Sequence, residues 1–201
     1  MLKVDYRKTL KHLYHPSSKT PVLVDVPPMN FLLMEGKGKP DGSGFQLVAS
    51  TLFPLAYTLK WMVRQECDID FHVMPMEVQW RVNREAKEFK WTMMLMQPEY
   101  VTAELVVKAR QKVLSKVDPS LLEQTRFESL TEGRCVQFLH VGAYEGMNAA
   151  MEKMIAFTEA QGYEVPKRNA HDIYLNDIRK TKPENLKAVM RFQVNQRKPS
   201  S

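Results

Sequence analysis

The chain contains few of the residues and patterns that mark several classes of protein. Only two cysteines, Cys67 and Cys135, occur in 201 residues. Two cysteines cannot build a disulfide framework and their spacing matches no zinc motif, so we expect neither a metal nor another cofactor. No apolar run reaches the ~18 residues of a membrane-spanning helix, and residues 1–6 lack the apolar core of a signal peptide. These absences favour a cytoplasmic protein with no membrane partner.

Charge is plentiful, but it is not gathered into a recognisable motif. The net charge is +6, and the basic residues are scattered along the chain apart from a short basic tail at Arg197. No helix-turn-helix, zinc finger or basic–aromatic motif is present, which argues against nucleic acid as a partner. A positive ligand would have to be attracted by charges local to its pocket, because the whole molecule is itself positive.

What the chain does contain is one order of elements that occurs twice: an apolar strand, a glycine turn, a helix and two strands. The predicted segments are 30–35, 44–65, 69–74 and 89–97 in the first copy, and 135–141, 146–161, 171–176 and 186–194 in the second. A period of this kind indicates related halves. Two related halves would face each other across a groove, which is a common place for a small ligand.

The predicted organisation is therefore a single domain over residues 1–195. Its parts are an N-terminal extension (1–29), a half-module (30–97), a linking helix (101–117), a second half-module (126–194) and a disordered tail (195–201). Thr102 is the expected N-cap of the linking helix, because its hydroxyl can accept a hydrogen bond from the first turn.

The strand predicted at 171–176 is the strongest candidate for a functional wall. Strand alternation puts Asp172, Tyr174 and Asn176 on one face and Ile173 and Leu175 on the other. If the apolar face packs on helices, the polar face opens toward the groove. A carboxylate beside an aromatic ring can bind a cation, or the carboxylate can orient a water while the phenol donates a proton. The alternative is that these are half-exposed sheet residues without a role.

A second candidate wall follows Pro75. Proline interrupts a strand, so we expect Glu77 and Trp80 on irregular backbone beside Met76. A glutamate close to a tryptophan has the same charge-and-ring chemistry, although a surface glutamate and a core tryptophan would give the same pattern. The chain holds thirteen methionines, which suit either an irregular core or an adaptable ligand surface.

A third candidate is the segment around Gly142. Phe138 and His140 share a face of the predicted strand, and Tyr144 follows the glycine at the mouth of the helix. His140 is either a hydrogen-bonded structural histidine or a base. No Ser-His-Asp arrangement or phosphate-binding loop accompanies these residues.

Motifs in this order over nearly the whole chain resemble the GyrI-like small-molecule-binding family, in its stand-alone cytoplasmic branch. The matching residues are Phe31–Gly38, Val73–Glu77, Gln137, His140–Gly142, Tyr144 and Ile173–Leu175, the last followed by Asp177 and Arg179. The resemblance implies an α+β fold in which a duplicated strand-helix-strand-strand module forms two antiparallel sheets with pseudo-twofold symmetry around a central ligand groove.

The resemblance also implies a ligand class and an activity. Family members bind planar aromatic, cationic or electrophilic molecules, and the stand-alone branch is similar to hydrolases that open cyclopropane rings. In the family pattern a glutamate precedes the Ile-Tyr pair, where this chain has Asp172, and an aromatic residue occupies the position of Arg81.

Two classes of function follow from these observations. The first is a small-molecule-binding protein that captures xenobiotics, with Glu77, Asp172, Tyr144 and Tyr174 available for hydrolysis. Its ligand contacts would come from Met76, Trp80, Phe138, His140 and Asn176. The second is a protein-interaction module that contacts gyrase or a regulator without catalysis.

Overall fold

A computed structural model of the chain describes residues 1–40, 42–83, 88–166 and 170–197. Helices and antiparallel strands are both present, which confirms the α+β class. The chain divides into two compact units. Unit 1 comprises residues 1–9 and 29–130, and unit 2 comprises residues 10–28 and 131–201. No helix in the described part of the chain is both long and apolar enough to cross a membrane.

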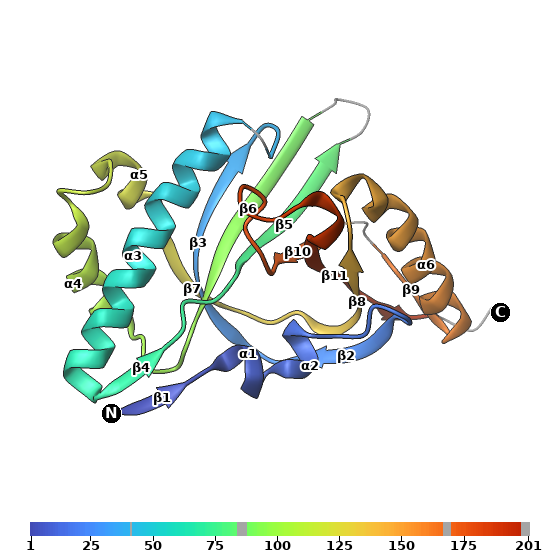
Figure 1. Cartoon of the computed structure of the whole chain (residues 1–201), viewed down its shortest axis with the longest axis horizontal. Helices are drawn as coiled ribbons and strands as arrows, with labels where there is room; N and C mark the ends of the chain where they lie inside the picture. Colours follow the sequence, from blue (N-terminus) through green and yellow to red (C-terminus); the bar gives the residue numbers. More distant parts are fainter. Residues whose placement is uncertain (41, 84–87, 167–169, 198–201) are drawn as a thin grey trace. The chain divides into compact units, whose positions relative to one another are not determined.

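Unit 1 is built on four antiparallel strands in the order β5-β6-β3-β7, with α3 and α4 side by side (Figure 1). The strands are β3 (Met29–Lys37), β5 (Met76–Asn83), β6 (Glu88–Gln97) and β7 (Arg126–Leu130), with a separate parallel pair of β1 (Leu2–Val4) and β4 (Ile69–Phe71). The helices are α1 (Tyr6–Thr9), α3 (Ser43–Cys67), α4 (Ala103–Val113) and α5 (Pro119–Glu123).

The core of unit 1 forms because α3 carries an apolar stripe along one side. Leu52, Leu55 and Leu59 recur at three- and four-residue steps and are fully buried. The helix runs through Pro54 without ending there. As predicted, Thr102 caps α4: its side chain accepts a hydrogen bond from the backbone N–H of Leu105.

Unit 2 carries a second set of four antiparallel strands, in the order β10-β11-β8-β2. The strands are β2 (Val22–Val26), β8 (Gly133–Val141), β10 (His171–Tyr174) and β11 (Lys187–Gln193), with a small pair of β9 (Tyr163–Glu164) and β12 (Asn195–Gln196). The helices are α2 (Lys11–Tyr14), α6 (Met147–Ala160) and the 3-10 turns η1 (Tyr144–Gly146) and η2 (Pro183–Asn185).

One face of the unit 2 sheet packs against α6. Phe138 and Met190, on neighbouring strands, are buried in one apolar cluster with Ala150 and Met154 of the helix. The helix ends shortly before Gly162, whose φ of +79° lies in the left-handed region that favours glycine.

The two units repeat the same element order, but their edge strands are exchanged along the chain. β2 directly precedes β3 of unit 1, yet it pairs with β8 of unit 2. β7 directly precedes β8 of unit 2, yet it pairs with β3 of unit 1. The repeated element order was predicted from the sequence, but this exchange was not. The pseudo-twofold relation stays a prediction.

Several predicted boundaries need correction. The sequence predicts no strand at β5 and irregular backbone around Glu77, whereas the strand is regular and pairs with β6 throughout. The predicted second half-module includes residues 126–130, but β7 belongs to the sheet of unit 1. The predicted disordered tail includes Asn195 and Gln196, but they pair with β9. Residues 198–201 of that tail lie outside the described residues.

Candidate functional site

Four of the nine predicted site residues come together in unit 2, and we call them the tyrosine cluster: His140, Tyr144, Asp172 and Tyr174. Tyr174 lies opposite Ala188, and Ala188 lies opposite His140, so these two side chains share a face with only a methyl group between them. The rings of Tyr144 and Tyr174 meet edge to face, with 5.5 Å between their centroids and an interplanar angle of 66°.

The negative charge in the cluster comes from Asp172. This side chain is only 5% exposed and lies opposite Met190 on the same face as Tyr174. Burial raises the pKa of the Tyr144 phenol, and the negative charges of Asp172 and Asp177 raise it further. Tyr144 therefore remains protonated at neutral pH and can donate a hydrogen bond.

His140 holds the entrance to α6 in place. Its Nε2 atom lies 2.9 Å from the carbonyl oxygen of Ala143. Because a carbonyl can only accept, Nε2 is the protonated nitrogen. A side chain at Gly146 would meet the imidazole ring at 3.0 Å. The contact with Ala143 fixes the turn that leads to Tyr144.

The face that carries Asp172 differs from the prediction. The sequence predicts that the face of Ile173 packs on helices and that the face of Asp172 is open. Instead α6 packs on the face that carries Phe138 and Asp172, because the apolar residues of β8 and β11 lie there.

Phe138 and Asn176 have structural surroundings. Phe138 is buried under α6, with the Lys153 ammonium 4.8 Å from its ring centroid. The Asn176 side chain donates to the carbonyl of Asn185 and accepts from the N–H of Lys187. Asn176 therefore braces the loop between β10 and β11.

In unit 1, strand β5 separates the three predicted residues onto two faces. Trp80 is opposite Trp91, and both rings contact Phe45 of α3, so this face belongs to the core. Met76 shares that face by alternation. Glu77 points to the other face and is fully buried. The structure does not bring Glu77 and Trp80 together on one wall.

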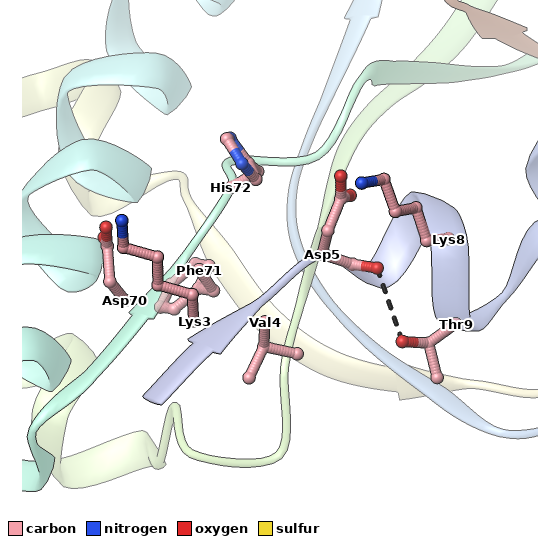
Figure 2. A pocket seen from close by; sticks show the side chains of 8 residues that line it. All are labelled: Lys3, Val4, Asp5, Lys8, Thr9, Asp70, Phe71 and His72. Atoms are coloured by element: carbon pink, nitrogen blue, oxygen red, sulfur yellow. Dashed lines mark hydrogen bonds between the residues drawn. The ribbon is translucent and has the colours of Figure 1, made fainter. Parts of the chain in front are cut away.

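Unit 1 also has a hollow of about 480 Å³ between β1, α1 and β4 (Figure 2). It is lined by Lys3, Val4, Asp5, Lys8, Thr9, Asp70, Phe71 and His72. The hydrogen bond from Arg7 lowers the pKa of Asp5, and the one from Lys60 lowers that of Asp70, so both remain ionised at neutral pH. None of the predicted site residues lines this hollow, and its charges are mixed in sign.

The sequence analysis missed a buried polar network on the other face of the unit 2 sheet. Glu132 accepts hydrogen bonds from Nδ1 of His171 and Nη1 of Arg191, both at 2.8 Å. Arg191 also donates to the carbonyl of Leu13 at 3.1 Å, and Gln137 donates to that of His12. The network therefore ties the segment 10–28 to the sheet.

The charges in this network are strongly coupled. Burial alone would raise the pKa of Glu132, but the positive charges of His171 and Arg191 and their hydrogen bonds outweigh it and lower the pKa to about 2. Burial raises the pKa of the nearby Cys135 thiol to about 12, with a further contribution from Glu132. Cys135 is accordingly a poor nucleophile.

One feature of the sequence could have revealed this buried network: Arg191 lies inside the apolar run of β11. A charged residue in such a run would be buried, and a buried charge requires a partner.

No group of three or more His, Cys, Asp or Glu side chains among the described residues could hold a metal ion. The groups that unit 2 can present to a ligand are thus the buried carboxylate of Asp172, the protonated phenol of Tyr144 and the rings of Tyr144 and Tyr174. Such a set suits the binding of an aromatic or positively charged group.

Comparison with known proteins gives a consistent result. The family of GyrI-like small molecule binding domains matches residues 19–195. A crystal structure of a hydrolase from Listeria innocua shares 35% identity with a TM-score of 0.85, covering 96% of this chain and 100% of that one. An uncharacterized conserved protein from Listeria innocua shares 34% identity with a TM-score of 0.86 and the same coverage.

The C-terminal domain of EcmrR is a more distant likeness. It shares 12% identity with a TM-score of 0.50, covering 88% of this chain and 98% of that one, and therefore shows the fold alone. A comparison with curated proteins gave no match.

Proposed function

The chain belongs to the family of GyrI-like small-molecule-binding domains, and from this premise we propose that it captures aromatic, cationic or electrophilic xenobiotics through the tyrosine cluster of unit 2. The observation that carries the proposal is the convergence of Asp172, Tyr144 and Tyr174. The buried carboxylate attracts a positive charge more strongly than an exposed one would. The two rings supply faces on which a planar ligand can stack.

Hydrolysis of a strained ring is a second activity that this cluster supports. In this step water adds to a ring carbon while the strained carbon–carbon bond breaks, and Asp172 accepts a proton from the water. Tyr144, which is held in its protonated form, donates a proton to a conjugated oxygen of the substrate that receives the electron pair of the broken bond. The similar Listeria innocua protein is described as a hydrolase. Glu77, the buried carboxylate of unit 1, is the alternative base.

We also propose that the protein is cytoplasmic. Its two cysteines, Cys67 and Cys135, are free thiols, as is usual in a reducing compartment.

Fluorescence titration with a planar cation, ethidium, and a neutral aromatic probe, N-phenyl-1-naphthylamine, tests the binding role. Asp172→Asn should weaken ethidium about tenfold, because one buried charge is lost, and should leave the neutral probe unchanged. Tyr144→Ala should weaken both. Asp25→Asn, which removes an exposed carboxylate from the same unit, is the matched control and should change neither.

Two results would contradict the binding proposal: no saturable binding of either probe, or equal affinities in the wild type and the Asp172 and Tyr144 variants.

Product analysis with a cyclopropane-bearing electrophile tests hydrolysis. It should show turnover by the wild type that Asp172→Asn abolishes. Turnover at the wild-type rate in both Asp172→Asn and Glu77→Gln would exclude these carboxylates as the base.

A further inference from the structure

The hollow of unit 1 is framed by elements that are fixed to one another. β1 pairs with β4 in parallel along both strands, and Lys3 lies opposite Asp70. The short helix α1 follows β1 directly, and the phenol of its Tyr6 donates a hydrogen bond to Glu99. The hollow of about 480 Å³ is large enough for a small ligand, and its walls are held by contacts within unit 1.

Both carboxylates that line the hollow already have positive partners. Asp5 accepts hydrogen bonds from the Nε and Nη2 atoms of Arg7, at 3.1 and 3.2 Å. Asp70 forms an ion pair with Lys60, whose Nζ atom lies 3.0 Å from Oδ1 of the carboxylate. Neither Arg7 nor Lys60 lines the hollow. The negative charges of the lining are therefore balanced by cations from outside it.

Two ammonium groups of the lining have no such partner. Among the described residues, the side chains of Lys3 and Lys8 make no hydrogen bond or ion pair, and both are exposed. Figure 2 shows them on opposite sides of the hollow, Lys3 on the side of Asp70 and Lys8 on the side of Asp5. Each side therefore has one positive charge in excess of its ion pair.

The other charged groups around the hollow do not reverse this excess. Glu99 adds one negative charge but does not line the hollow. Arg64 adds one positive charge: the hydrogen bond from Lys60 lowers the pKa of Asp70, and the charge of Arg64 lowers it further. His72, which lines the hollow, adds another positive charge when it is protonated.

The lining also has an apolar part. Val4 lies opposite Phe71, which is only 2% exposed, and both residues line the hollow. In Figure 2, Val4 lies between the two lysines. A hydrocarbon segment of a ligand can contact this apolar surface while charged groups at its two ends reach Lys3 and Lys8.

We propose that this hollow binds a dianion whose two negative groups are joined by a short hydrocarbon chain, as in an α,ω-dicarboxylate. One carboxylate pairs with Lys3 and the other with Lys8, and the chain lies over Val4. A ligand with one anionic group can pair with only one of the two ammoniums, because they lie on opposite sides of the hollow. The inference is independent of the proposed function, since all of the lining residues belong to unit 1.

NMR titration of the ¹⁵N-labelled full chain tests this proposal with matched pairs of probes. Suberate is compared with octanoate, and adipate with hexanoate, so that each pair has the same number of carbons and differs by one carboxylate. At neutral pH and fixed ionic strength, at least one dicarboxylate should saturably shift the backbone amides of residues 3–5 and 70–72. Its affinity there should be about fivefold higher than that of its monocarboxylate, as expected for one additional exposed ion pair.

Lys3→Gln and Lys8→Gln should each remove this preference, because either variant leaves a single ammonium. Both side chains are exposed, so both variants should keep the dispersed amide spectrum of the wild type. Lys108→Gln is the matched control. It removes an ammonium from α4 of the same unit that is likewise exposed and makes no ion pair with the described residues. It should keep the preference for the dicarboxylate.

Several results would overturn the proposal. They are equal affinities within both pairs of probes, no saturable shift at residues 3–5 and 70–72, an unchanged preference in Lys3→Gln or Lys8→Gln, and a preference lost in Lys108→Gln. Saturable shifts of the same amides with 1,6-diaminohexane would also overturn it, because the hollow would then bind cations at Asp5 and Asp70. Ethidium binding is measured separately, so each of these results would leave the proposed function standing.

Discussion

At the scale of single residues, the tightest constraints in this protein fall on buried charge. The Arg191 side chain is fully buried, and its partner Glu132 is nearly so. Each supplies the charge that the other needs, because an isolated ion inside a protein is costly. Removing one partner of such a pair typically destabilises a protein by about 3–5 kcal/mol, mostly through the charge that is left behind.

Glu132 should make the free energy of unfolding depend on pH. Its folded pKa of about 2 lies below the ordinary value of 4.5, so folding favours the ionised carboxylate. The stabilisation is complete above about pH 4.5 and is lost as the pH falls toward 2. The difference in pKa corresponds to about 3 kcal/mol.

Urea denaturation of the wild type and Glu132→Gln between about pH 2 and pH 6 measures this contribution. The wild type should lose the stabilisation over that range, and the variant should lack it throughout. Glu128→Gln removes an exposed carboxylate and should keep the wild-type profile. Parallel profiles for the wild type and Glu132→Gln would show that the carboxylate is not stabilised in the folded state.

At the scale of elements, the packing between β3 and β6 depends on one glycine. Gly36 lies opposite Trp91, and a Cβ atom at Gly36 would meet the indole ring at 2.1 Å. The ring is fixed because its Nε1 donates to the carbonyl of Gly38 at 3.0 Å. The close approach of ring and backbone explains why no side chain fits there.

Gly36→Ala should therefore destabilise unit 1 by about 2 kcal/mol, the usual cost of overpacking a core. Chemical denaturation followed by tryptophan fluorescence measures the loss. Gly44→Ala is a suitable control, because its Cβ would lie 3.9 Å from the nearest atom and alanine is the better helix former. Gly44→Ala should be neutral or slightly stabilising. Equal stabilities of the two variants would refute the steric account.

The sequence alone predicted helices and strands wherever the local pattern of apolar and capping residues was clear. The helix at 44–65 and the cap at Thr102 were both readable, because each depends on residues close together in the chain. β5 was missed because Pro75 suggested irregular backbone, although the strand begins directly after it.

The candidate site was less predictable than the elements. Alternation correctly put Asp172 and Tyr174 on one face, but it could not say which face a helix would cover. That choice depends on the apolar residues of β8 and β11, which join β10 in one sheet only in the folded chain. Long-range partners, such as Glu132 for Arg191 or Thr92 for Arg81, leave no local pattern.

At the scale of the whole molecule, the exchanged edge strands make the two units unequal in how far apart in the sequence their parts lie. Residues 1–130 contain every strand of unit 1. Residues 131–201 lack β2 and the carbonyl groups of His12 and Leu13 that the network of Arg191 requires. A sheet that loses both an edge strand and the partners of a buried charge should not remain folded.

We therefore expect fragment 1–130 to fold alone and fragment 131–201 to be unfolded alone. Amide NMR spectra should be dispersed for the first and collapsed for the second. Mixing the two should restore dispersion to the second, because residues 10–28 then supply β2. Fragment 29–130, which lacks that segment, should fail to do so. A folded spectrum for isolated 131–201 would show that the segment is dispensable.

The same exchange has a consequence for synthesis on the ribosome. β2 emerges early, but its partner β8 begins more than a hundred residues later. Unit 1 can close as soon as β7 leaves the exit tunnel, while β2 waits unpaired on the nascent chain until β8 has also emerged. During that interval an apolar strand is open to association with other chains, and this is the stage at which a chaperone would matter most.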